Sequence, residues 1–281
     1  MITFEHDTGR AQAAVTSAQR RGLPVPDEIQ ATAAMVQVAL DAAHMKAPSR
    51  PTIDDVPSTP EELAALIEER AHAQRIAASH REIASDYLEP IARRYNQLVR
   101  DQVPGWIRAL QPEFNGLVKQ LRPLARKLPA SLDKNWLDWN DPAISTPWAR
   151  VEGIALQLDQ ILRDRADMVK ASDLKGEHVI DRDLYAVAKL PDPTVTGVAQ
   201  HHMRTHIGPE MRQWKELGRD PVRRWVHLVR SEYLTIELAT PDEVRERAVV
   251  RDRWYEGIAV RGIAPVPTQK ALKAIETALR G

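Results

Sequence analysis

Residues 59–87 read "TPEELAALIEERAHAQRIAASHREIASDY", and this stretch decides the fold. Thr59 stands directly before Pro60, an arrangement typical of a helix start because the first helical amide has no partner to lose. Glu62 completes a capping box with Thr59. Apolar residues then recur every three or four positions, which predicts one long helix from Pro60 to about Val103. The stripe consists of Leu63, Leu66, Ile67, Ala73, Ile76, Ile83, Tyr87, Ile91, Tyr95 and Leu98.

Three more predicted helix starts use the same pairing of an oxygen-bearing residue with Pro. They are Thr146-Pro147, Asp220-Pro221 and Thr240-Pro241, and Glu243 completes a second capping box. Gly is scarce, with 12 residues, and aromatic residues make up only 5% of the chain, which favours helix over sheet. We therefore predict an all-α protein: a multi-helix bundle with a long central α-hairpin and a C-terminal helical domain.

A second long helix is expected to begin at Pro147 and to form the other arm of the hairpin. Its apolar residues follow a heptad pattern in which Arg165 occupies one core position. We expect it to pack antiparallel against the 60–103 helix, where small residues permit close approach. The heptad residues are Val151, Ile154, Leu158, Ile161 and Met168, and the small residues are Ala73, Ala77 and Ala84.

Proline and glycine mark the expected interruptions of the long helix. Pro90 predicts a kink, because proline has no amide hydrogen to donate. The sequence "VPG" at 103–105 is expected to end the helix. Residues 106–128 are then expected to form short helical pieces, separated at Pro112 and Pro123.

The chain is expected to divide into four segments. Residues 1–46 hold a pair of helices, at 8–21 and 27–46. The Pro- and Ser-rich residues 47–59 form an extended linker or, alternatively, a surface loop packed on the body. Residues 60–171 form the hairpin or bundle. Residues 172–281 form a mainly helical domain, with helices at 209–217, 221–238, 241–255 and 268–280, and a strand or short helix within 178–190.

Composition excludes several classes of protein. Lys and Arg balance Asp and Glu at 39 each, so no net charge steers the chain toward nucleic acid or an acidic membrane. There is no Cys, and therefore no disulfide, thiol nucleophile or iron–sulfur cluster. No leader and no membrane-length apolar run is visible, so we expect a soluble, cytoplasmic protein, or a virion protein if it is phage-encoded.

The sequence "AQHHMRTHIGPEM" at 199–211 is the candidate metal site. His202, His206 and Glu210 stand four apart and are residue types that bind zinc or another divalent metal. However, no Glu follows His202 as the general base of a hydrolase, and Pro209 is expected to end the helix near Ile207. The favoured alternative is a helix end whose imidazoles pair with free carbonyls. If metal binds, His178, Asp181 or Asp183 would complete the site.

A Trp-rich segment, "NWLDWNDPAISTPW" at 135–148, is the candidate partner-binding site. Exposed Trp is favoured at interfaces, so Trp136, Trp139 and Trp148 would anchor a partner protein. The alternative, which we favour, is that these rings close the end of the hairpin.

The segment "DPVRRWVHLVRSEYLTIEL" at 220–238 interleaves Arg with aromatic residues, a pattern also found in nucleic-acid-binding proteins. An amphipathic helix with an Arg-rich solvent face explains it as well, and we do not expect nucleic acid as a partner.

The chain has no Gly-rich phosphate loop and no G-x-S-x-G motif, so no cofactor or nucleophile is indicated. The leading hypothesis is a non-enzymatic structural or scaffolding protein that assembles with itself or with another protein. A metal-dependent enzyme that uses His202 and His206 is the first alternative, and a nucleic-acid-binding protein is the second.

Overall fold

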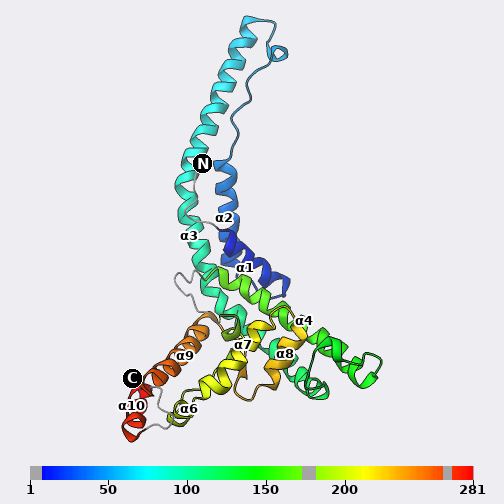
Figure 1. Ribbon diagram of the computed structural model, residues 1–281. Coiled ribbons are helices and arrows are strands. Elements are labelled where there is room, and N and C mark those ends of the chain that lie inside the picture. Colours follow the sequence, from blue (N-terminus) through cyan, green and yellow to red (C-terminus); the bar gives the residue numbers. More distant parts are fainter. Residues whose placement is uncertain (1–7, 173–181, 262–267, 281) are drawn as a thin grey trace. The chain divides into compact units, whose positions relative to one another are not determined.

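The computed structural model describes residues 8–172, 182–261 and 268–280, and these are almost entirely helical (Figure 1). The all-α prediction is confirmed. The chain forms two compact units, Met1–Gln102 and Val103–Gly281, and the division falls inside one helix, α3 (Pro60–Lys127). No helix in the described ranges has an apolar stretch suited to crossing a membrane.

The first unit contains α1 (Gly9–Arg20), α2 (Asp27–Ala43) and the beginning of α3. The helices at 8–21 and 27–46 are confirmed, with α2 ending slightly earlier than predicted. Tyr95 Oη donates a hydrogen bond of 3.0 Å to Gln12 Oε1, which ties α3 to α1. Between α2 and α3 the chain is extended, with one 3₁₀ turn (Ile53–Asp55), and Arg70 donates to the carbonyl of Ser49.

The helix α3 continues through all four of its internal prolines, so the predicted end at 103–105 and the short pieces at 106–128 are wrong. Pro90, Pro112 and Pro123 lie on exposed positions, where water can satisfy the carbonyls that lose an amide partner. Burial of apolar residues between Val99 and Ala125 outweighs the local cost of proline, whereas much of the predicted stripe before Val99 is exposed. The buried residues of this part are Val99, Val103, Trp106, Ile107, Leu110, Phe114, Leu117, Val118, Leu121 and Ala125.

The second unit contains the rest of α3 together with α4 (Pro142–Lys170), α5 (Arg182–Tyr185), α6 (Val195–Ala199), α7 (Gly208–Glu216), α8 (Pro221–Arg230), α9 (Pro241–Arg261) and α10 (Gln269–Arg280). A 3₁₀ turn (Lys134–Trp136) precedes α4, and a π-helical turn (Met203–Ile207) precedes α7. The strands β1 (Ala188–Lys189) and β2 (Thr235–Ile236) pair antiparallel, with Ala188 opposite Ile236. The segment 221–238 is therefore a helix that ends at Arg230 and not one long helix.

The core of the second unit centres on Trp225 of α8. Its ring meets Phe114 of α3 edge-on at 6.0 Å and Trp214 of α7 edge-on at 5.3 Å. The predicted heptad stripe of α4 is buried, and α4 contacts α8. Arg165, in its predicted core position, is only 6% exposed and donates from Nε to the carbonyl of Ala239 at 2.7 Å.

The predicted start of α4 is wrong. The helix begins at Pro142, because Asp141 caps it by accepting a hydrogen bond from the amide of Ala143, and Pro147 lies within the helix. Ala77 and Ala84 of the small-residue stripe are buried in the first unit, and Ala84 lines a groove to which α2 also contributes.

The predicted capping devices at three other helix starts are confirmed. Thr59 and Glu62 exchange both hydrogen bonds of a capping box at the start of α3. Thr240 and Glu243 do the same at the start of α9. At the start of α8, Asp220 accepts a hydrogen bond from the amide of Arg223.

Candidate functional site

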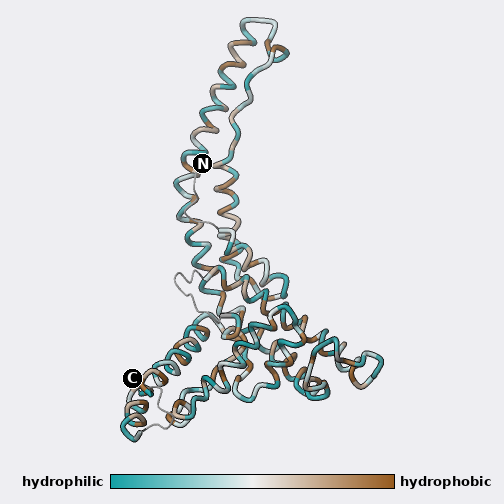
Figure 2. The backbone as a smooth tube through the Cα atoms, in the orientation of Figure 1, coloured by the Kyte–Doolittle hydropathy of each residue, from teal (hydrophilic) through white to brown (hydrophobic). Residues whose placement is uncertain are grey.

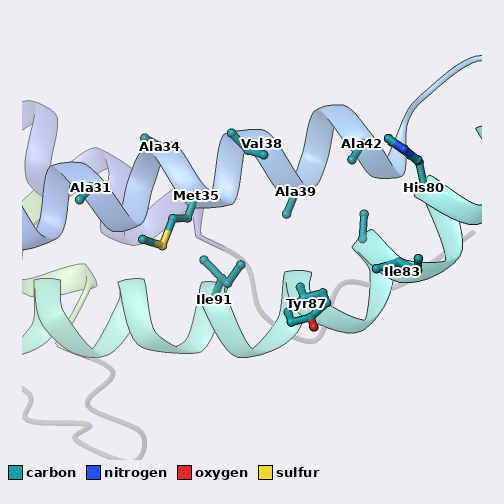
Figure 3. Close-up of a pocket in the computed structure, with 11 residues that line it drawn as sticks. Ala31, Ala34, Met35, Val38, Ala39, Ala42, His80, Ile83, Tyr87 and Ile91 are labelled. Carbon is teal, nitrogen blue, oxygen red and sulfur yellow. The ribbon is translucent and has the colours of Figure 1, made fainter.

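The most distinctive surface of the chain is an apolar groove in the first unit, between α2 and α3. Its volume is about 540 Å³. Figure 3 shows that the two helices run in opposite directions along it, with Ala31 opposite the Ile91 end and Ala42 near His80. The α2 residues that line it are Ala31, Ala34, Met35, Val38, Ala39 and Ala42, and the α3 residues are His80, Ile83, Ala84, Tyr87 and Ile91.

Large apolar side chains of this groove remain exposed to water. The exposed fraction is 51% for Met35, 69% for Val38, 55% for Ile83 and 62% for Tyr87. Single exposed apolar residues are ordinary, but four on the walls of one groove form a contiguous patch, which marks an interaction site.

The sequence of α2 explains why the groove exists. Ile29, Val36 and Ala39 are buried in the core of the first unit. A second apolar stripe, which includes Met35 and Val38, lies on the face toward the groove. The charged residues of α2 are only Asp27, Glu28 and Asp41. A helix that is apolar on most of its circumference requires partners on more than one side, and α3 covers only one of these sides.

The groove is electrically neutral apart from one imidazole. His80 is the only ionisable side chain among the lining residues other than the phenol of Tyr87. The nearby charges of Arg94 and Glu28 compensate each other in an ion pair of 2.8 Å. The site therefore favours an apolar, uncharged surface as its partner.

The predicted histidine cluster lies in the second unit. Its helix does not end near Ile207 as expected, because a π-helical turn runs from Met203 directly into α7. The wide turn lets the amide of Gly208 donate to the carbonyl of Met203. A Cβ atom on Gly208 would lie 2.7 Å from that carbonyl oxygen, so glycine is required at this position.

The structure brings His202 and His206 together but turns Glu210 to other partners. The two imidazole rings meet edge-on at 5.4 Å, and His206 stacks on Tyr233 at 4.9 Å. Nε2 of His202 lies 3.0 Å from Oε1 of Gln200, while the Glu210 carboxylate accepts a hydrogen bond from the hydroxyl of Ser231.

His201, directly before the pair, has a φ of 58°, an uncommon conformation for a non-glycine residue. Within the described ranges, no group of three His, Asp or Glu side chains is arranged to hold a metal ion. The further ligands considered from the sequence, His178 and Asp181, lie outside the described residues, and Asp183 is exposed on α5.

The tryptophans of the candidate partner-binding site differ in their surroundings. Trp148 is buried at 5% exposure, and its ring meets Trp139 edge-on at 5.2 Å. Trp139 keeps 43% exposure and donates from Nε1 to the carbonyl of Lys134 at 3.2 Å. Trp136 ends the 3₁₀ turn before α4. The burial of Trp148 favours a structural role for that ring.

Two arginines of α8 contact other parts of the second unit. Arg224 forms an ion pair with Asp159 of α4 and lies over the ring of Trp214 at 4.6 Å. Arg230 donates to the carbonyls of Ala125 and Leu128 at the end of α3. These contacts hold helices together within the second unit.

Sequence reasoning missed the α2–α3 groove, although a signal for it was present. The segment 27–43 carries more apolar positions than one buried face requires, and these positions form two stripes. No protein-family model, curated protein or solved structure matches this chain.

Proposed function

We propose that this chain is a structural or scaffolding protein that assembles with a second copy of itself through the α2–α3 groove. The single observation that carries the proposal is the exposure of large apolar side chains on both walls of one groove. Burying such side chains in a partner is favourable by about 25 cal/mol per Å² of apolar surface. Figure 2 colours the backbone by hydropathy and shows apolar positions on both α2 and α3, which lie side by side.

The area of the patch is suited to a stable dimer. Lining residues span Ala31–Ala42 on α2 and His80–Ile91 on α3. With a rise of about 1.5 Å per residue and a diameter of about 10 Å per helix, this face covers roughly 350–400 Å². A standard interface takes about 800 Å² from each partner, of which half to two-thirds is apolar. The groove thus supplies most of the apolar centre of such an interface.

The two walls of the groove complement each other in size, which favours a second copy over an unrelated partner. The α2 wall is dominated by alanine, and the α3 wall carries Ile83, Tyr87 and Ile91. A twofold axis parallel to the helices places the large side chains of one copy over the alanines of the other, in both directions at once. The product is a four-helix bundle made of two antiparallel helix pairs.

The chemistry of the groove argues against other kinds of partner. Nucleic acid and acidic membranes are recognised through clustered Lys and Arg, and neither residue type lines the groove. Catalysis requires polar groups that converge on a substrate, and the described residues of the groove walls are apolar apart from His80 and the hydroxyl of Tyr87. A foreign amphipathic helix would fit the groove, and it is the competing occupant in the test below.

Cysteine cross-linking tests the arrangement directly, because the chain has no native thiol. Two single-thiol proteins, Val38→Cys and Tyr87→Cys, carry different tags, are mixed, and react with a short bismaleimide. The proposed dimer places α2 of one copy over α3 of the other. The mixed 38–87 product should therefore form faster than either product of like chains.

Val249→Cys serves as the matched control, because Val249 is 56% exposed but lies on α9 and does not line the groove. It should give only background cross-linking at the same protein concentration. Cross-linking of the groove variants that does not exceed this background would contradict the proposal.

A further inference from the structure

Two polar hollows in the second unit share one wall, the side chain of Arg230. The first has a volume of about 410 Å³ and is lined by Arg122 and Arg126 of α3 and by the turn that follows α8. The second has a volume of about 300 Å³ and is lined by Arg223 and His227 of α8. Among the described residues, the ionisable side chains around both hollows are four arginines and one histidine, against the single carboxylate of Glu232.

The shared wall is a fixed positive charge. Nη2 of Arg230 donates to the carbonyls of Ala125 at 2.6 Å, Leu128 at 2.7 Å and Pro129 at 3.0 Å. These acceptors carry no formal charge, so they orient the guanidinium without neutralising it. Burial accordingly lowers the pKa of Arg230 from its ordinary value.

The other two arginines of the first hollow are in excess of what the fold requires. Arg122 and Arg126 stand one turn apart on α3, where like charges repel and destabilise a helix by a few tenths of a kcal/mol. Neither side chain forms an ion pair with a residue of the described ranges. The carbonyls at the end of α3 are already satisfied by Arg230, so helix capping does not account for both cations.

A neighbouring arginine that has a structural role does have a counterion. Arg224 has its own carboxylate, Asp159, and its side chain is 13% exposed. Arg223, the next residue along the chain, lines the second hollow and has no carboxylate partner in the described part of the protein. The described arginines that face the hollows thus lack the counterion that Arg224 has.

We propose that the first hollow binds a compact ligand that carries two linked phosphate groups, held by Arg122 and Arg126 beside the fixed charge of Arg230. Guanidinium groups match phosphate oxygens in charge and in bidentate geometry. The volumes are those of small-molecule sites. A nucleic-acid strand fits less well, because no Trp, Tyr or Phe lines either hollow for base stacking and the chain has no net charge.

Isothermal titration calorimetry of the full chain with inorganic pyrophosphate tests this site. Inorganic phosphate and ADP are titrated in parallel. Pyrophosphate should bind with one site per chain and at least tenfold more tightly than phosphate, because its second phosphate group adds negative charge opposite the arginines of the first hollow. ADP that binds as tightly as pyrophosphate means that only the phosphates are recognised, and tighter binding of ADP means that the organic group also makes contact. Either result supports the site.

The decisive variant is Arg122→Ala/Arg126→Ala, and its matched control is Arg108→Ala/Arg163→Ala. All four residues are exposed, and both double variants remove two positive charges, but the control residues lie outside the hollows. The first variant should weaken pyrophosphate binding at least tenfold. Without ligand its melting temperature should equal or exceed that of the wild type, because the repulsion between the two arginines is removed.

Three results would overturn the proposal. They are an absence of heat with pyrophosphate at millimolar concentration, equal weakening by the control variant, and preferential binding of a single-stranded RNA oligonucleotide over pyrophosphate. The last result would assign the arginines to a nucleic-acid backbone instead.

Discussion

Trp225 and Asp159 join α8 to α4 through a buried hydrogen bond, in which the indole Nε1 donates to Oδ1 at 2.6 Å. The same carboxylate oxygen forms the ion pair with Arg224. One side chain of α4 thereby satisfies two donors of α8, next to the aromatic core formed by Trp214, Trp225 and Phe114. This relationship makes Asp159 the polar centre of the second unit.

Asp159→Ala should therefore be strongly destabilising. It leaves the Arg224 cation without its carboxylate and the Trp225 N–H without an acceptor, in a site where the Asp159 side chain is 10% exposed. Removing one partner of a buried ion pair costs about 3–5 kcal/mol. The free energy of unfolding, measured by urea titration, should fall by this amount. Asp167→Ala, which removes an exposed pairing with Lys170, should change it by less than about 0.5 kcal/mol. Equal effects of the two variants would contradict this account.

Two glycine-to-alanine substitutions should have opposite effects. Gly208→Ala places a methyl group against the carbonyl of Met203 in the π-helical turn and should cost roughly 1–3 kcal/mol. Gly116→Ala, within α3, meets no neighbouring atom and should stabilise the protein by about 0.5–1 kcal/mol, because alanine loses less backbone freedom on folding. Thermal unfolding of both variants checks the signs. A stabilising Gly208→Ala would mean that the π-helical turn is not required.

The buried Arg165 predicts an unusual dependence of stability on pH. Burial and, to a smaller extent, the nearby cation of Arg247 lower its pKa to about 10, while Asp183 and Glu243 act in the opposite direction. Above about pH 10, and below the higher pKa that arginine has in the unfolded chain, the unfolded chain holds a proton at this site that the folded chain has lost. The contribution of this residue to the free energy of unfolding therefore rises with pH in that window.

The measurement compares wild type with Arg165→Met, which keeps an unbranched side chain at this buried position without the charge. From about pH 9 to about pH 11 the stability of the wild type relative to the variant should increase by about 1 kcal/mol. Effects of Lys and Tyr titration are common to both proteins and cancel in the difference. A difference that stays constant or decreases with pH would show that the folded pKa of Arg165 is not lowered.

The helical class was predictable because its signals are local. The pairs at Thr59-Pro60, Asp220-Pro221 and Thr240-Pro241 all cap helices as expected, since a cap depends only on residues within one turn. The start of α4 followed the same rule, but at Asp141-Pro142 and not at Thr146-Pro147. Both pairs fit the rule, and the sequence alone does not rank them.

The length of α3 was not predictable from local signals. Pro90, Pro104 and Pro112 each oppose a helix when considered alone. They are tolerated because tertiary burial of residues such as Val103, Trp106 and Phe114 compensates for the lost hydrogen bonds, and such burial depends on partners distant in sequence.

The candidate sites of the sequence shared a similar limitation. His202 and His206 do lie together, but the direction of Glu210 depends on Ser231, which is 21 residues away. Predicting the α2–α3 groove would have required knowing which part of the chain covers Ala77 and Ala84. Spacing along one helix predicts a buried face, but it does not identify the helix that covers it.

The most direct test of self-association is molar mass by light scattering after size exclusion. At micromolar concentration the wild type should have twice the 31.7 kDa of one chain. Val38→Glu introduces a charge at a 69% exposed groove position and should give the single-chain mass with an unchanged helical spectrum. Val249→Glu, the same substitution outside the groove, should keep the doubled mass. A wild type that has the mass of one chain up to about 100 μM, or a Val249→Glu protein that dissociates as Val38→Glu does, would contradict the proposed assembly.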